Sequence, residues 1–116
     1  MIDLKKLKID KFRGIRHENF PSDLHPGFES ARKNYDVILY YIDRPEDVQN
    51  FVHLCKSSPL PRENRTILVY KNGRKDGVNH DAVFFPFRND VTFALRTPLM
   101  CALSDDLSAY IMSRIL

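Results

Sequence analysis

The sequence predicts a single small α/β domain, 1–116, with a three-layer-like arrangement around a mixed sheet of four or five strands. The first observation is an unbroken apolar run at 37–42, framed by Asp36 and Asp43, which predicts a strand at 36–43 that is covered on both faces. The second is a change to helical spacing at 44–56, and the third is another apolar run at 67–70, which predicts a strand at 66–71. Together they predict a strand–helix–strand unit with a parallel, right-handed crossover, while an antiparallel return of the last strand stays open.

The expected helix at 44–56 has a well-marked start. Asp43 is the expected N-cap and Glu46 its capping-box partner, and Pro45 falls in the first turn, where its missing N–H costs nothing. The helix is expected to end near Lys56, because a proline-containing loop follows. We expect a core made of Val37, Leu39, Tyr41, Phe51, Val52, Cys55, Leu68 and Ile111.

The elements around this unit are marked less strongly. Residues 12–17 suit a short strand that Gly14 weakens, and 28–34 suit one or two helical turns. Residues 80–85 fit either a strand or a short helix.

Two apolar runs near the C-terminus, 91–95 and 99–103, suit strands. A final helix is predicted at 105–115, with Ser104 as its N-cap and acidic residues in its first turn. The face of this helix would carry Leu107, Tyr110, Ile111 and Ile115.

Composition places the chain among ordinary globular proteins. Of its 116 residues, 43% are hydrophobic and 28% charged, and no apolar run approaches the ~20 residues that span a bilayer. The N-terminus lacks the apolar centre of a signal peptide, so we expect a cytoplasmic protein with no membrane contact. Cys55 and Cys101 lie in apolar sequence and are expected to be reduced core residues.

Charge is concentrated at the N-terminus. Residues 1–16 have a net charge of +4. Since the whole chain has a net charge of +3, the remaining residues sum to −1. A basic N-terminal arm at 1–16, with its cations at 5–16, is one way to bind nucleic acid. A solvated amphipathic segment explains the same residues and is favoured, since the overall basic excess is small.

The loop that follows the second strand is the main candidate ligand site. Lys71, Gly73, Arg74 and Lys75 lie in it, and Asp81 is close by. Ligands of open α/β sheets lie beyond the carboxyl ends of the strands, where glycine N–H groups and cations can hold an anionic small molecule. The spacing matches no nucleotide-binding motif, and a solvated strand-exit turn is favoured.

Aromatic residues crowd one short stretch. Phe84, Phe85, Phe87 and Phe93 fall within ten residues around Pro86. They form either a contact surface, which predicts a two-fold homodimer, or a second part of the core.

No cofactor or metal site is expected. The four histidines are dispersed, without ligand spacing for zinc, and neither cysteine has the surroundings of a nucleophile. The histidines are His17, His25, His53 and His80.

One resemblance joins several of these segments. Tyr70-Lys71, His80-Asp81 and the run Asp105-Asp106-Leu107-Ser108-Ala109 occur in an order similar to a family of small bacterial proteins known only as a domain of unknown function. In that family a Tyr-Pro-Lys loop precedes an Arg-Asp element and a late Asp-Asp-x-Ser-Ala turn. Here the proline is missing and His80 replaces the arginine. The resemblance, over 35–114, implies a compact α/β domain and no activity.

These observations favour a non-catalytic binding or assembly module. Two alternatives remain: a small enzyme or binding protein for an anionic or phosphorylated compound through 71–81, and nucleic-acid binding through 5–16.

Overall fold

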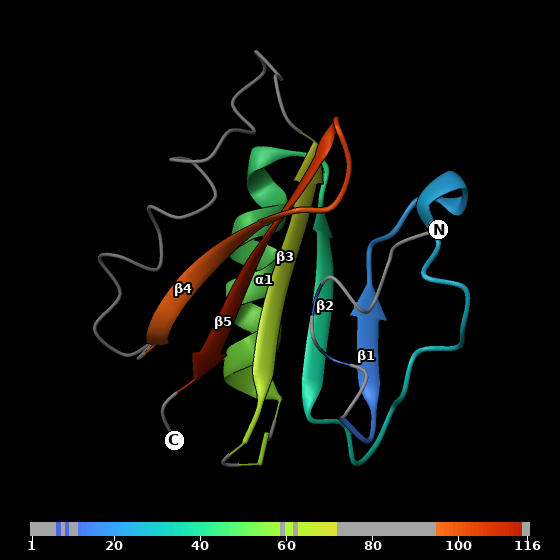
Figure 1. Cartoon of the computed structure of the whole chain (residues 1–116). Coiled ribbons are helices and arrows are strands. Elements are labelled where there is room, and N and C mark those ends of the chain that lie inside the picture. Colours follow the sequence, from blue (N-terminus) through green and yellow to red (C-terminus); the bar gives the residue numbers. More distant parts are fainter. Residues whose placement is uncertain are drawn as a thin grey trace.

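The structure is a computed structural model, and it describes residues 7, 9, 12–58, 60–61, 63–71 and 95–114. These residues form one five-stranded sheet with the strand order β1-β2-β3-β5-β4 (Figure 1). In chain order the elements are β1 (Ile15–Glu18), the 3-10 turn η1 (Ser22–Leu24), β2 (Val37–Ile42), α1 (Pro45–Ser57), β3 (Arg65–Lys71), β4 (Leu95–Ala102) and β5 (Leu107–Arg114). The predicted α/β class with a mixed sheet is confirmed.

The predicted strand–helix–strand unit is present. β2 and β3 are parallel neighbours with Ile42 paired to Tyr70, and α1 connects them across one face of the sheet (Figure 1). β1 is also parallel to β2, whereas β5 runs antiparallel to β3 and β4 antiparallel to β5. β3 therefore runs parallel to β2, which decides between the two predicted alternatives. The bounds of β2, α1 and β3 lie within two residues of the predicted ones.

Both faces of β2 are buried, as its apolar sequence requires. Tyr40 and its alternate neighbours pack against α1, where the Phe51 ring meets the Tyr40 ring at a centroid distance of 5.4 Å. Leu39 and its alternate neighbours pack on the opposite face, against Ile67 and Val69. Seven of the eight predicted core residues are buried, while Ile111 is only partly buried.

Irregular chain covers the sheet face opposite α1. Leu7 and Ile9 are fully buried there, and Phe12, Phe20 and Leu24 pack against the same cluster. The helix, the sheet and this irregular cover give the three-layer-like arrangement. Since Leu7 and Ile9 are core residues, the basic N-terminal segment is anchored at these two positions.

The prediction of helical turns at 28–34 is wrong. This segment runs along the outer edge of β1, where the Ala31 N–H donates to the Ile15 carbonyl at 2.9 Å and the Ser30 hydroxyl accepts from the His17 N–H at 2.9 Å. Bonding to an exposed strand edge satisfies backbone groups that a helix would have paired internally.

The prediction of a C-terminal helix at 105–115 is also wrong, because residues 107–114 form β5. Ser104 is a turn residue rather than an N-cap, and its hydroxyl donates to Asp106 at 2.8 Å. The Leu103 N–H closes the hairpin on the Leu107 carbonyl at 2.9 Å. Three residues of the predicted helical stripe lie within β5, which pairs with both β3 and β4: Tyr110 packs on the α1 side of the sheet, and Leu107 and Ile111 pack on the opposite side.

The start of α1 differs from its prediction by one residue. Arg44 is the N-cap, and the carboxylate that receives the backbone is Asp47, not Glu46. One oxygen of Asp47 accepts from the N–H groups of Asp43 and Arg44, each at 2.9 Å. Pro45 is the first helical residue, as expected. Among the described residues no helix has both the length and the apolar character needed to cross a bilayer.

Candidate functional site

A hollow lies at each end of the parallel strands. The one at their carboxyl ends has a volume of about 520 Å³ and is lined by Asn19, Phe20, Pro21, Tyr41, Asp43, Arg44 and Asp47. We call it the carboxyl-edge hollow. Two of its polar groups serve the fold: Asn19 donates to the Tyr41 carbonyl at 2.8 Å, and the buried Asp47 accepts from backbone N–H groups at the start of α1. The Asp47 carboxylate occupies the helix start that an anion would otherwise use.

Of the sequence-predicted ligand residues, the structure describes Lys71 alone. It is the last residue of β3, and because Ile42 pairs with Tyr70, Lys71 follows at the same edge as Asp43. The remaining predicted residues lie outside the described part of the chain and stay predictions. They are Gly73, Arg74, Lys75 and Asp81 for the ligand, and Phe84, Phe85, Phe87 and Phe93 for the interface.

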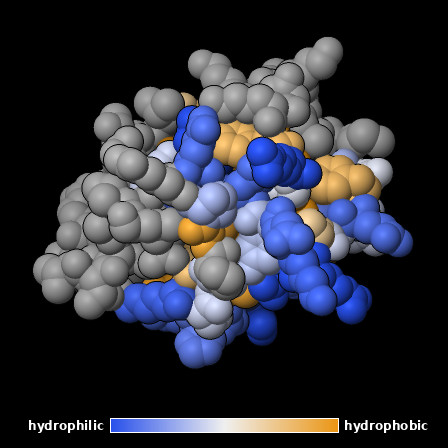
Figure 2. Space-filling view, turned by 90° about the horizontal axis from the view of Figure 1, so that it is seen from below, coloured by the Kyte–Doolittle hydropathy of each residue, from blue (hydrophilic) through white to orange (hydrophobic). Residues whose placement is uncertain are grey.

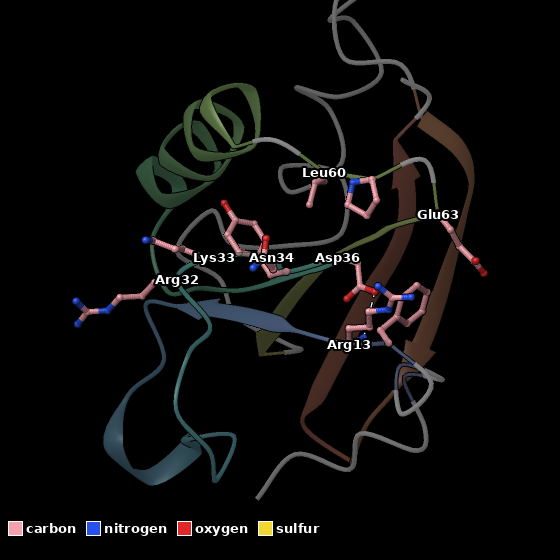
Figure 3. A pocket seen from close by; sticks show the side chains of 10 residues that line it. Arg13, Arg32, Lys33, Asn34, Asp36, Leu60 and Glu63 are labelled. Atoms are coloured by element: carbon pink, nitrogen blue, oxygen red, sulfur yellow. Dashed lines mark hydrogen bonds between the residues drawn. The ribbon is translucent and has the colours of Figure 1, made fainter.

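The larger hollow lies at the opposite, amino ends of the same strands. It has a volume of about 960 Å³ and is built by the segments that lead into β1, β2 and β3. Its described lining is Phe12, Arg13, Arg32, Lys33, Asn34, Tyr35, Asp36, Leu60, Pro61 and Glu63 (Figure 3). We call it the amino-edge hollow. Figure 2 looks onto this end of the molecule and shows apolar side chains surrounded by hydrophilic ones.

Asp36 joins two of the three segments. Its carboxylate accepts from the Arg13 N–H at 3.1 Å and from the Gly14 N–H at 3.0 Å, and its own N–H donates to the Gly14 carbonyl at 3.1 Å. Both carboxylate oxygens are therefore engaged by the backbone. The carboxylate keeps its negative charge and lies beside Arg13 in the hollow (Figure 3).

Arg16 supports the hollow from behind. Its guanidinium donates to the Tyr35 hydroxyl at 3.0 Å and to Glu18 at 3.2 Å. Burial lowers the pKa of Arg16, but these two hydrogen bonds outweigh burial and raise the pKa above its usual value. Arg16 thus stays charged, and Tyr35, which is 7% exposed, is held in place.

Arg65 holds Phe12, another residue that lines the amino-edge hollow. It donates to the Ser113 hydroxyl at 3.0 Å and to the Asn64 carbonyl at 2.8 Å, and its guanidinium carbon lies 5.2 Å from the centre of the Phe12 ring. A guanidinium at this distance is attracted by the aromatic face. Phe12 is thereby fixed between the N-terminal segment and the sheet.

The described lining holds three exposed cations. They are Arg13, Arg32 and Lys33, and the exposed carboxylate of Glu63 and the partly buried side chains of Phe12 and Leu60 line the same hollow. The described lining holds no His, Cys, Ser or Thr, and within the described residues no three metal-binding side chains gather. Electrostatic attraction of an anion, with apolar contact alongside, is the chemistry that this arrangement supports.

Sequence reasoning missed this hollow. The sequence predicts a ligand site at the carboxyl ends of the strands, and for the run from Arg32 to Asp36 it predicts helical turns followed by the start of a strand. The available signal was the pair Arg32–Lys33 directly before the most strongly predicted strand. This pair indicates a site only when Arg13 and Leu60 lie at the same edge of the sheet. That follows from the strand order, which the sequence does not show.

The fold and the hollow define a small mixed-sheet α/β domain with a hollow at the amino ends of its parallel strands, and the described lining of this hollow has a formal net charge of +1. Comparisons with protein-family models, with curated proteins and with solved structures each found no match. The resemblance to a bacterial domain of unknown function thus stays a prediction.

Proposed function

We propose that this protein is a non-catalytic binding module whose amino-edge hollow takes the anionic group of a ligand. The single observation that carries the proposal is the set of three exposed cations, Arg13, Arg32 and Lys33, around one hollow. The described lining also holds the carboxylates of Asp36 and Glu63, so its three cations leave a formal net charge of +1 (3 − 2).

The architecture suits binding more than chemistry. Tyr35 and Phe12 are held by Arg16 and Arg65, so the walls are preorganised, which lowers the free-energy cost of binding. Nucleophilic attack by a hydroxyl or thiol needs a Ser, Thr or Cys side chain. The described lining holds none of these, which favours a binding role.

The proposal is tested by the response of thermal unfolding to citrate and pyrophosphate. A ligand that binds only the folded state raises the melting temperature. We expect a rise for the wild type and none for the triple variant Arg13→Ala, Arg32→Ala, Lys33→Ala. Arg44→Ala is the matched control, since Arg44 is an exposed cation at the carboxyl edge. Equal responses in the triple variant and the wild type would reject the proposal.

A second candidate is a small enzyme or binding protein for a phosphorylated compound at loop 71–81. Lys71 favours it, because this cation ends a parallel strand at the edge where such ligands usually bind. In the same assay, loss of the response in Lys71→Ala rather than in the triple variant would favour this candidate.

We also propose the two-fold homodimer that the aromatic residues at 84–93 predict. Light scattering at high micromolar concentration is expected to give twice the monomer mass, and Phe85→Glu is expected to give a folded monomer. A monomeric wild type would contradict this proposal.

A further inference from the structure

β4 is an edge strand of the sheet. It pairs with β5 on one side, and among the described strands none lies beyond it (Figure 1). At the opposite edge, β1 is closed by the chain's own segment 28–34, which binds the Ile15 carbonyl and the His17 N–H. An edge strand offers a row of backbone donors and acceptors to another chain. We call the side of β4 that faces away from β5 its outer edge.

The hairpin fixes which backbone groups of β4 lie at this outer edge. The Leu103 N–H donates to the Leu107 carbonyl at 2.9 Å, and the pairing continues through Cys101 without a register shift. In an antiparallel ladder, successive residues turn their N–H and C=O groups alternately toward the partner strand and away from it. The backbone groups of Cys101 therefore face β5, whereas those of Met100 and Ala102 face the outer edge.

The last four residues of β4 lack the features that keep edge strands from pairing with other chains. Such strands usually carry charged side chains, proline or a bulge. Pro98 and the register shift of β4 both come before residue 99, and 99–102 reads Leu-Met-Cys-Ala. Met100 is 53% exposed and is the one exposed large hydrophobic side chain among the described residues. A neighbouring strand would remove part of this side chain from water, which stabilises the pairing.

Resting on the homodimer proposed above, we infer that 99–102 forms its interface. Two copies pair their β4 strands antiparallel across the two-fold axis and so join their sheets into one. Met100 of each copy lies opposite Ala102 of the other, and both residues use their outer backbone groups. The two Cys101 residues then face each other on the axis. A register centred on Met100 would instead place Ala102 opposite Pro98, which has no N–H.

A second copy of the chain is the partner that this arrangement favours. Pairing of β4 with β1 of the next molecule would build an open filament, and segment 28–34 blocks it by covering the β1 edge. Pairing of β4 with β4 closes after two copies. It also brings no two like charges together, because 99–102 carries no charged side chain.

The register is tested through Cys101. Residues opposite each other without shared hydrogen bonds have Cα atoms about 4.5 Å apart, which a disulfide can span. Diamide, which takes up the two thiol hydrogens, is therefore expected to link the wild-type dimer, with the disulfide mapped to Cys101. Cys101→Ser is expected to give no linked dimer. A wild-type dimer that diamide does not link through Cys101 would overturn this register.

The strand pairing is tested by Ala102→Pro, which removes an N–H at the outer edge and spares the pairing with β5. Sedimentation equilibrium is expected to show dimerisation weakened at least about tenfold, because symmetry removes the hydrogen bond twice. Met100→Lys is a second variant expected to weaken the dimer. Gln49→Lys, on the exposed side of α1, is the matched control and is expected to leave it unchanged.

The outcomes separate the interface from the dimer itself. If the dimer survives both β4 variants but Phe85→Glu gives a monomer, the β4 inference is wrong while the proposed homodimer stands. If the wild type is monomeric, both fall. Loss of the dimer in Ala102→Pro and Met100→Lys, with the Cys101 link lost in the proline variant, supports the inference. Circular dichroism verifies that each variant is folded.

Discussion

Gly14 and Asp36 hold each other through two hydrogen bonds of opposite direction. The Gly14 N–H donates to the Asp36 carboxylate at 3.0 Å, and the Asp36 N–H donates to the Gly14 carbonyl at 3.1 Å. A Cβ on residue 14 would lie 3.0 Å from the Asn34 carbonyl oxygen and 3.1 Å from the Tyr35 Cα, which are backbone atoms that cannot move aside easily. The closeness of these two chain segments, which builds the amino-edge hollow, therefore depends on a glycine.

Replacing Asp36 with Ala is expected to destabilise the protein by about 1–3 kcal/mol, because the Gly14 N–H loses its acceptor in a partly buried place and the Arg13 N–H loses one at the surface. Urea unfolding measures this loss. Glu29→Ala is a control with an exposed carboxylate, expected to cost about 0.5 kcal/mol or less. Equal costs for the two variants would show that the Asp36 carboxylate does not hold the segments together.

Replacing Thr66 with Val is expected to stabilise the protein. Thr66 is fully buried in β3 between Ile38 and Met112, and its hydroxyl has no hydrogen-bond partner within the described part of the chain. Valine has nearly the same shape and removes the cost of a buried unpaired hydroxyl, about 1–2 kcal/mol. Denaturant midpoints measure the gain, and a lower midpoint for Thr66→Val would reveal that the hydroxyl is satisfied in solution.

Replacing Phe51 with Ala is expected to cost ~3–5 kcal/mol, as for other large truncations in a core. Phe51 is fully buried between α1 and the sheet and packs edge-on against Tyr40. Gln49→Ala on the exposed side of α1 is the matched control and is expected to change stability by about 0.5 kcal/mol or less. A loss below ~1 kcal/mol for Phe51→Ala would contradict the packing of α1 on β2.

Stability is expected to fall at alkaline pH. Burial, followed by the charges of Asp47 and Glu18, raises the pKa of Tyr40, and burial raises the pKa of Tyr70 against a hydrogen bond with Ser108. The folded protein then holds these protons more tightly than the unfolded chain. Their contribution is complete below the unfolded pKa of about 10 and is lost as pH rises toward the higher folded values.

Urea midpoints between about pH 9 and 11 measure this dependence. Tyr40→Phe and Tyr70→Phe are each expected to reduce its slope, whatever their effect at neutral pH. If the variant with both substitutions shows the same dependence of the urea midpoint on pH as the wild type, groups other than these two tyrosines cause the loss of stability at alkaline pH.

The unit formed by β2, α1 and β3 was predictable because its local and tertiary requirements agree. An apolar run such as 37–42 suits only a strand buried on both faces, and Pro45 suits only the first turn of a helix. The N-cap is Arg44 and not the predicted Asp43. The carboxylate that accepts from the backbone N–H groups at the helix start is that of Asp47. Which of several neighbouring acids turns inward is a matter of packing.

The C-terminal segment was not predictable in the same way. Leu107, Tyr110 and Ile111 satisfy helical spacing, and the alternation of 107–112 equally satisfies a strand with two covered faces. The pairing with β3 and β4 decides between them, because it satisfies the backbone on both sides of β5.

The sequence by itself determined the class of the domain, the central unit and most of the core, since these follow from periodicity along a continuous segment. Only the tertiary structure decided the fate of the C-terminal segment and the position of the basic hollow. Arg13, Arg32 and Leu60 lie in three separate segments, and the parallel order of β1, β2 and β3 alone brings them to one edge. A site assembled from strand ends has no local pattern, because its residues become neighbours only when the sheet forms.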